Sequence, residues 1–282
     1  MNNLTNWPLV GGVLAGGLLL GFLLGQGSVA VAPPNPQARA LDADTWIQTS
    51  AEYHACCLQT YRFAWERLRD KLARLPKEGL PPAVILDLDE TVLDNSPFQT
   101  WMYRWRLGYD QSLWDRWEED FPDEVRVMPG AADFLRNAEN AGLTVYYISN
   151  RNQRTADSTR KALDHLGLST RDFDRRFLGR TSQTGNDKDS RRETVRKGHR
   201  VLMLLGDNLR DFSDEFKAPE VKPTDGPELR KGIAERKAKV DRERAKFGEE
   251  WVILPNPVYG EWAKLQGADP LEVLNPSRMP GP

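Results

Sequence analysis

The sequence predicts a three-layer α/β fold built around a parallel, Rossmann-like sheet. Four apolar runs have the length of buried strands and lie at residues 83–86, 144–148, 201–205 and 251–254. Helix-like sequence separates the runs, as the long crossovers between parallel strands require. Three of the runs end in small polar or acidic residues. Because the carboxyl ends of parallel strands meet at one edge of a sheet, we expect these polar groups to share a ligand-binding crevice.

A long amphipathic helix is predicted ahead of the first strand. Within residues 44–75, apolar side chains recur three and four positions apart, which would lay one stripe of the helix on the core. Cys56 and Cys57 are interpreted as packing residues of this helix, because adjacent cysteines rarely form a disulfide. His54 is interpreted as a structural residue of the same helix.

Turn residues mark the ends of three crossover helices. The first is expected to open at Pro129 and close at Gly142, the second to end near Gly167, and the third to run from near Lys188 to Gly198. Residues 226–247 are mostly charged with alternating sign, which predicts an exposed helix or a mobile arm.

Charged and polar groups follow the predicted strands. Asp87 and Asp89 follow the first strand, one residue apart, so their side chains would share one face. Ser149-Asn150 ends the second strand, Asp207 follows the third, and Lys188 lies between these two strands. Taken singly, a solvated loop, a strand-end cap, a turn and a surface lysine would explain these residues. Taken together at one sheet edge, they indicate a phosphoryl-transfer site.

The four segments together resemble the haloacid dehalogenase-like (HAD-like) phosphatases. The shared motifs are Asp-Leu-Asp-Glu-Thr at residues 87–91, Ser-Asn-Arg at 149–151, a lysine at 188 and Gly-Asp-Asn-Leu-Arg-Asp at 206–211. A closer resemblance is to the bacterial class C acid phosphatases, the 5′-nucleotidase or outer-membrane lipoprotein e group. That group shares an extended first motif running to Pro97 and a late Leu-Pro-Asn-x-x-Tyr-Gly-x-Trp, here residues 254–262. The resemblance covers nearly all of the chain after about Leu41.

This resemblance implies a HAD-like core and a Mg²⁺-dependent acid phosphatase, with nucleoside 5′-monophosphates as the expected substrates. Asp87 is the expected nucleophile and would form an aspartyl-phosphate. Asp89 is the expected general acid for the leaving oxygen and then the general base for the hydrolytic water. Asp87, Asp89 through its backbone carbonyl, and Asp207 are the expected Mg²⁺ ligands. If Asp89 must start protonated beside another acid, the pH optimum should be acidic.

Further residues are expected around the phosphoryl group. Ser149, Asn150 and Lys188 would hold its oxygens as charge redistributes in the transition state. Thr91 is expected to support the phosphate-binding group. Asp211 is expected to orient Lys188 or a metal-bound water.

Residues 92–128 are expected to form a small helical cap that covers the site and selects the substrate. Trp114 and Tyr259 match aromatic positions that resembling enzymes use to sandwich a nucleobase or another aromatic leaving group. Stacking tolerates different bases, so broad specificity for nucleoside monophosphates would follow. The remaining tryptophans of the segment are predicted to pack the interior of the cap, and they are Trp101, Trp105 and Trp117.

The N-terminal region is predicted to be separate from the enzyme domain. Residues 1–40 are interpreted as a signal peptide or membrane anchor with a Pro-rich linker, residues 41–270 as the phosphatase domain, and residues 271–282 as a tail. The stretch from Trp7 to Leu24 carries no charge, and no cysteine lies in it or just after it for lipid attachment. We therefore expect an extracytoplasmic protein of the periplasm, cell envelope or medium, in contact with the membrane if the segment is not cleaved.

Composition limits the partners. With 282 residues, 39% of them apolar, the chain can bury a large core, and its net charge of −2 argues against a nucleic-acid polymer as partner. The expected partner is a small-molecule phosphate monoester, and a homo-oligomer is left open. Two other functions are also left open: a phosphotransferase that uses the same aspartyl-phosphate, and a non-enzymatic surface protein that binds a ligand such as haem.

Overall fold

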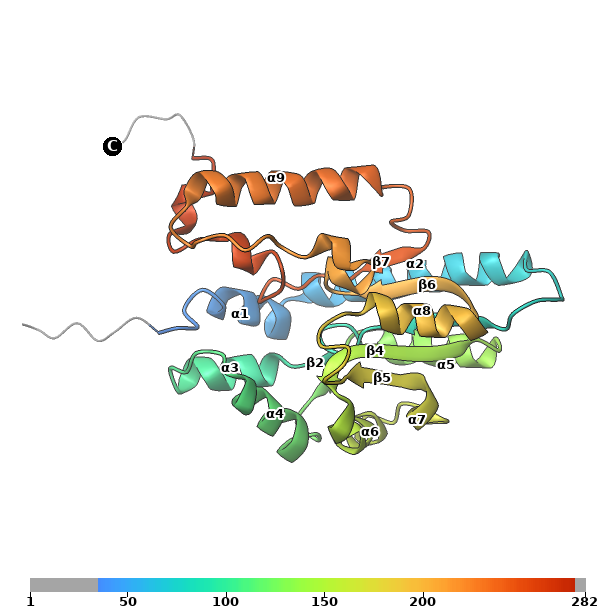
Figure 1. The fold of residues 1–282 in the computed structure, drawn as a ribbon. Helices are drawn as coiled ribbons and strands as arrows, with labels where there is room; N and C mark the ends of the chain where they lie inside the picture. Colours follow the sequence, from blue (N-terminus) through green and yellow to red (C-terminus); the bar gives the residue numbers. More distant parts are fainter. Residues whose placement is uncertain (1–34, 277–282) are drawn as a thin grey trace, which may run out of the picture. The chain divides into compact units, whose positions relative to one another are not determined.

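The structure, a computed structural model, describes residues 35–276. Its centre is a five-stranded sheet with the strand order β5-β4-β1-β6-β7 (Figure 1). The strands are β1 (Pro82–Leu86), β4 (Thr144–Asn152), β5 (Phe177–Arg180), β6 (Arg200–Gly206) and β7 (Trp251–Ile253). All neighbouring strands of this sheet are parallel, with β1 in the middle. The predicted α/β class and the parallel sheet are confirmed.

Helices pack against both faces of the sheet, because successive residues of a strand point to opposite sides. Val84 of β1 lies in a core cluster with residues of α2 (Ala51–Ala73) and α5 (Ala131–Asn140). The next residue, Ile85, lies in a second cluster with residues of α8 (Asp189–Gly198). Burying two apolar faces in this way gives the predicted three layers.

The crossover helices begin and end close to the predicted turn residues. α5 follows Gly130, whose φ of 90° suits glycine, and ends before Gly142. α6 (Ala156–His165) ends before Gly167, and α8 ends at Gly198. These helices are long enough to return the chain to the start of the next parallel strand.

The predicted long helix at residues 44–75 is wrong in one respect, because it is two helices. α1 (Leu41–Thr49) ends at Ser50, whose backbone is extended, and α2 begins directly after it. The Ser50 hydroxyl accepts a hydrogen bond from the N–H of Tyr53 at 3.0 Å, an N-cap that starts a new helix. Cys56 and Cys57 lie on α2 as free thiols, and Cys57 is fully buried in the core.

One strand, β5, was missed by the sequence analysis. It has four residues and directly follows the short helix α7 (Phe173–Arg176). Its sequence is two apolar residues, a glycine and an arginine, which is too short to show the alternation of apolar and polar residues that predicts a strand. β5 pairs with β4 at Phe177 and again at Arg180, so it brings Arg180 to the carboxyl edge of the sheet.

An insertion after β1 forms a cap. It contains the antiparallel strands β2 (Leu93–Asp94) and β3 (Arg126–Val127) and the helices α3 (Ser96–Arg104) and α4 (Gln111–Asp120). The rings of Trp114 and Trp117 contact Phe98 in its centre, and Trp101 stacks on Phe98 but remains exposed. The prediction for Trp105 is wrong: this residue is 61% exposed, because it follows the end of α3 outside the cluster.

The C-terminal part of the domain contains α9 (Gly226–Arg242), so the charged segment predicted at 226–247 is mainly a helix. Leu229 anchors α9 in a small third cluster with Ala218 and Leu265. Short 3-10 helices are η1 (Gln153–Thr155), η2 (Leu209–Asp211), η3 (Asp214–Phe216), η4 (Ala263–Leu265) and η5 (Pro270–Glu272). Within residues 35–276, no helix has the length and apolar character of a membrane span. The predicted signal peptide or anchor lies outside the described residues.

Candidate active site

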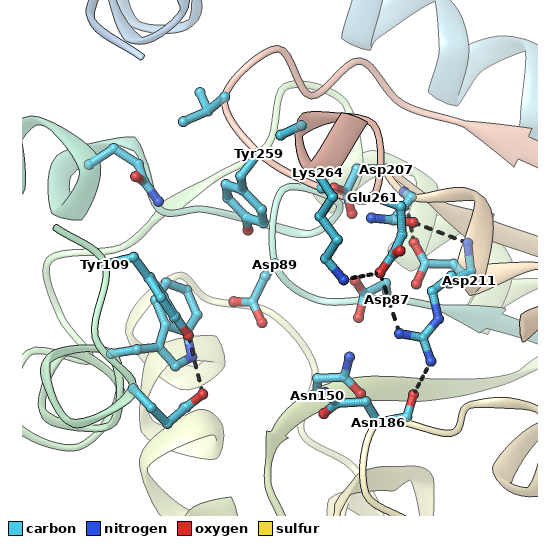
Figure 2. A pocket seen from close by; sticks show the side chains of 18 of the residues that line it. Asp87, Asp89, Tyr109, Asn150, Asn186, Asp207, Asp211, Tyr259, Glu261 and Lys264 are labelled. Atoms are coloured by element: carbon cyan, nitrogen blue, oxygen red, sulfur yellow. Dashed lines mark hydrogen bonds and ion pairs between the residues drawn. The ribbon is translucent and has the colours of Figure 1, made fainter. Parts of the chain in front are cut away.

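The carboxyl ends of three strands bring predicted polar residues together. Asp87 continues the ladder beyond β1, with its N–H bonded to the carbonyl of Leu205 at 3.0 Å, and Asp207 follows β6. Asn150 lies near the end of β4. All three line a cavity of about 590 Å³, together with Asp89 (Figure 2). The strand ends therefore converge on one crevice, as expected for an open parallel sheet.

Lys188 binds two of the carboxylates. Its Nζ lies 2.8 Å from Asp87 Oδ1 and 2.7 Å from Asp211 Oδ1. The backbone N–H of Lys188 donates to Asp214 Oδ2 at 2.8 Å, which fixes the chain just before α8. Burial opposes the charge on Lys188, but Asp211 and Asp87 outweigh this effect and raise its pKa above the ordinary value. Lys188 therefore stays protonated in the crevice, and it is buried and not part of a solvated face.

A tight turn after β6 places Asp211. The N–H of Asn208 donates to Asp211 Oδ2 at 2.9 Å, and the Asn208 side chain accepts the N–H of Arg210 at 3.1 Å, which makes a capping box at η2. A Cβ atom at Gly206 would collide with the Asp211 carboxylate, so glycine is needed there. The spacing of the Gly-Asp-Asn-x-x-Asp motif follows from this turn.

A second network holds Asp89. Arg151 Nε donates to Oδ1 at 2.9 Å, Asn95 Nδ2 donates to the same oxygen at 3.0 Å, and the Ser149 hydroxyl donates to Oδ2 at 3.3 Å. Burial disfavours the Arg151 cation, but Asp89 and Glu118 raise its pKa above the ordinary value. Asn95 has no role in the sequence prediction, although its position within the extended first motif is a signal for one.

Two of the residues predicted around the phosphate lie behind the carboxylates. Ser149 is fully buried in the network described above. Thr91 is also fully buried, with its hydroxyl 3.4 Å from Asp207 Oδ1. Neither side chain lines the cavity, whereas Asn150 does, with its Oδ1 accepting a bond from Arg191 Nη2 at 2.8 Å. The phosphate-binding roles of these residues stay predictions.

Comparison with known proteins agrees with this geometry. Residues 27–262 match the family described as HAD superfamily, subfamily IIIB (acid phosphatase). The chain belongs to this family. A crystal structure of class C acid phosphatase from Bacillus anthracis with tungstate bound is 34% identical, with a TM-score of 0.70, and the match covers 83% of this chain and 89% of that one. A second structure of the class C acid phosphatase from Bacillus anthracis has 34% identity and a TM-score of 0.70, covering 81% and 88%.

This membership makes the chain a phosphomonoesterase and not a non-enzymatic binding protein. HAD phosphatases generally use a divalent metal, and this acid phosphatase has an acidic cluster that could hold one. Asp87, Asp207 and Asp211 each place one carboxylate oxygen within 4.8 Å of the others. The ligands predicted from the sequence are Asp87, Asp207 and the backbone carbonyl of Asp89, with Asp211 outside that set. In the structure the Asp211 carboxylate belongs to the acidic cluster, and the Asp89 carboxylate does not.

The electrostatics of the cluster fit a cation. Burial raises the pKa of Asp87 to about 7, although Lys188 acts in the opposite direction. Burial, with repulsion from Asp211 and Asp87, raises the pKa of Asp207 well above its ordinary value. One lysine does not balance three closely spaced carboxylates, so a divalent cation would relieve the remaining repulsion. Oxygen-only ligands favour a hard ion.

Aromatic residues line another part of the cavity of this acid phosphatase. Trp114, on α4 of the cap, is 9% exposed and lines the cavity. Tyr259 lies in the loop after β7 and also lines the cavity (Figure 2). Asn256 ties this loop to the catalytic edge: its Oδ1 accepts the N–H of Tyr259 at 3.3 Å and its Nδ2 donates to Asp207 Oδ2 at 2.8 Å. Both predicted aromatic residues therefore reach the cavity. Their role in holding a base stays a prediction.

Proposed function

We propose that this acid phosphatase hydrolyses nucleoside 5′-monophosphates with Mg²⁺, through an aspartyl-phosphate on Asp87. The observation that carries the proposal is the position of the Asp87 carboxylate. It is paired with Lys188 at 2.8 Å and lines the same cavity as Trp114 and Tyr259. A nucleophile beside a cation, in a cavity with aromatic walls, suits the phosphate ester of an alcohol that carries a planar base.

In the first step, an oxygen of Asp87 attacks phosphorus, and the bond from phosphorus to the ester oxygen breaks. The Asp89 carboxyl gives its proton to the leaving oxygen, so the nucleoside departs as a neutral alcohol. Lys188 and Asn150 line the cavity with Asp87 and would share the negative charge of the phosphoryl oxygens. Neutralising that charge lets an anionic nucleophile approach an anionic substrate.

In the second step, water attacks phosphorus, and the bond from phosphorus to Asp87 breaks. Asp89, now ionised, takes a proton from the water, which restores both side chains and releases inorganic phosphate. The contacts of Asp89 with Arg151, Asn95 and Ser149 keep its carboxyl in one place for both proton transfers.

Asp87, Asp207 and Asp211 would hold the Mg²⁺ ion, with the backbone carbonyl of Asp89 as the further predicted ligand. When bound, the ion would supply positive charge to the phosphate oxygens that Lys188 alone does not provide. The tungstate in the Bacillus anthracis relative supports an oxyanion as ligand, because tungstate and phosphate are both tetrahedral oxyanions.

A substrate panel tests the proposal. The full chain is assayed for phosphate release from 5′-AMP, 5′-UMP, ribose 5-phosphate and phenyl phosphate, with Mg²⁺ and after chelation. The nucleotides should exceed ribose 5-phosphate in kcat/KM by roughly tenfold or more, because stacking on one base contributes about 1–3 kcal/mol. Chelation should abolish turnover, and Mg²⁺ should restore it. Full activity without metal, or equal rates with and without a base, would contradict the proposal.

We also propose that the uncharged segment before residue 35 directs the enzyme out of the cytoplasm, either as a cleaved signal or as a membrane anchor. The absence of charge from Trp7 to Leu24 supports this location. Fractionation of producing cells, with the N-terminal residue of the mature enzyme determined by mass spectrometry, distinguishes the two fates. Full-length enzyme confined to the cytoplasmic fraction would contradict export.

A further inference from the structure

The solvent-facing side of the cap helix α3 carries two exposed tryptophans. Trp101 is 40% exposed and Trp105 is 61% exposed. The backbone N–H of Trp105 donates to the carbonyl of Trp101 at 3.1 Å, so the two residues lie one helical turn apart on the same side of α3. Thr100 and Arg104 are the other exposed residues of this helix. We call Thr100, Trp101, Arg104 and Trp105 the outer face.

The opposite side of α3 faces the domain. Phe98 and Met102 are buried there, and Met102 lines the substrate cavity. None of the four outer-face residues lines that cavity. A partner on the outer face would therefore contact a different side of α3 from the one that faces the substrate. Because tryptophan is usually well buried, two of them on one exposed helix face indicate such a partner.

The chemistry of the outer face fits the surface of a phospholipid bilayer. Tryptophan is enriched where a membrane meets water, because its ring lies at the level of the headgroups with its apolar body toward the lipid. Arg104 offers a guanidinium group that can bind lipid phosphates. α3 contains no acidic residue, so none of its own side chains would repel anionic headgroups.

The path of the chain places this face close to the uncharged N-terminal segment. Asn35 Nδ2 donates to the carbonyl of Tyr103 in α3 at 2.8 Å, which fixes the start of the domain beside this helix. The uncharged segment ends at Leu24, and the ten residues that separate it from Asn35 span at most roughly 35 Å. A chain anchored by that segment would keep α3 within this distance of the bilayer. Such a tether lets a weak second contact form, because it raises the effective concentration of the lipid surface.

We propose that the outer face of α3 docks on the phospholipid surface when the chain is anchored in a membrane. This inference rests on the proposed membrane anchor and goes beyond it, because an anchor alone would leave the domain free to rotate. With two attachments the domain has one orientation. The indoles of Trp101 and Trp105 enter the headgroup layer, and Arg104 binds lipid phosphates.

Crosslinking of the full chain to lipid tests the inference. The chain is inserted into vesicles of phosphatidylethanolamine and phosphatidylglycerol that contain a phospholipid with a photoactivatable headgroup, and mass spectrometry maps the crosslinks. We expect crosslinks at Trp101 and Trp105, and none at Phe63, which is also 40% exposed but lies on α2. Trp101→Glu should lower crosslinking at Trp105 by roughly tenfold, because it removes one indole and adds a charge that anionic lipids repel.

Phe63→Glu is the matched control, since it makes the same kind of change at an equally exposed aromatic residue, and it should leave crosslinking at Trp105 unchanged. Circular dichroism and phosphate release from phenyl phosphate should show that both variants fold. If Trp101→Glu does not fold, Arg104→Glu at an exposed position of the same face takes its place, and it should also lower crosslinking at Trp105.

Three results would overturn docking alone while the chain still floats with the vesicles. They are crosslinks confined to residues 1–34, equal crosslinking at Phe63 and Trp105, and unchanged crosslinking at Trp105 in the outer-face variant. An outer face covered by a second copy of the chain, or by the chain's own first 34 residues, would give no lipid crosslinks at Trp105. A full chain that does not float with the vesicles overturns the proposed membrane anchor together with this inference.

Discussion

The catalytic edge and the cap side of the same cavity are built differently. At the catalytic edge, each carboxylate has a protein partner: Lys188 for Asp87 and Asp211, Arg151 for Asp89, and Asn256 for Asp207. On the cap side, the cavity is lined by aromatic and apolar side chains, among them Trp114 and Met102. Reacting groups are thus held by charged and polar partners before substrate arrives, whereas the cap side offers surface for packing and stacking.

The largest expected effect comes from removing one carboxylate of the catalytic edge. Asp87→Asn should lower kcat by on the order of 10⁴-fold, because an amide is not a nucleophile for phosphorus at neutral pH. Phosphate release from 5′-AMP measures the loss. Asp133→Asn, which changes an exposed acid on α5, is the control and should leave kcat unchanged. A nearly normal rate in Asp87→Asn would contradict the assignment of Asp87 as the nucleophile.

A weaker effect is expected when a partner of the catalytic edge is changed instead of a reacting group. Arg151→Lys keeps a cation but loses the fork that holds Asp89 and contacts Asn95. We expect kcat to fall by on the order of 10²-fold while KM changes little, because the orientation of Asp89 acts on the chemical step. Steady-state kinetics with 5′-AMP separates the two constants. A rise in KM alone would assign Arg151 to substrate binding.

The cap side should respond in KM and by a smaller factor. Trp114→Ala should raise KM for 5′-AMP by roughly tenfold, since stacking on one base contributes about 1–3 kcal/mol. Trp105→Ala is the matched control, because Trp105 is exposed and does not line the cavity. The ratio of the two KM values is the measurement. Equal effects of the two substitutions would show that Trp114 only packs the cap.

The smallest effect on catalysis is expected at Asp44, a buried acid on α1 whose carboxylate oxygens have no hydrogen-bond partner. Burial, and then Asp94, raises the Asp44 pKa from 3.8 to about 7. The folded state therefore binds this proton more tightly than the unfolded state. The resulting stability is complete below the unfolded pKa and is lost as pH rises through the folded pKa.

Asp44→Asn removes this pH-dependent loss. The variant should be more stable than wild type at pH 8, by at most about 4 kcal/mol for a shift of about three pKa units, with a smaller gain at pH 5. Urea unfolding at the two pH values measures the gain, and kcat should not change. A gain that is larger at pH 5 than at pH 8 would contradict the assignment. The result would show whether unpartnered polar groups outside the catalytic edge cost stability.

The catalytic edge could be predicted from the sequence because its residues occur in compact motifs after apolar runs. Asp87 and Asp207 each follow a strand whose burial forces it into the centre of the sheet. The short strand β5 could not be found this way, and Ser50 gave a helix start that the continuous apolar stripe concealed. Local capping and tertiary pairing decided those two elements.

The cap side could be predicted only in part. Trp114 and Tyr259 were found through a family motif, and both reach the cavity. Residue type and spacing do not show which side chains of the cap face the cavity and which pack beneath it, and only a three-dimensional structure shows that. Trp105 illustrates this limit, since residue type alone wrongly predicted its burial.

The most direct test of the central claim is to trap the phosphoryl group on the enzyme. The full chain is mixed with 5′-AMP and Mg²⁺, quenched in acid within the first turnover, reduced with borohydride and mapped by mass spectrometry. If Asp87 is the nucleophile, the acyl phosphate is reduced to homoserine at position 87 alone, and no such change appears without substrate. Modification at another residue in place of Asp87 would contradict the mechanism.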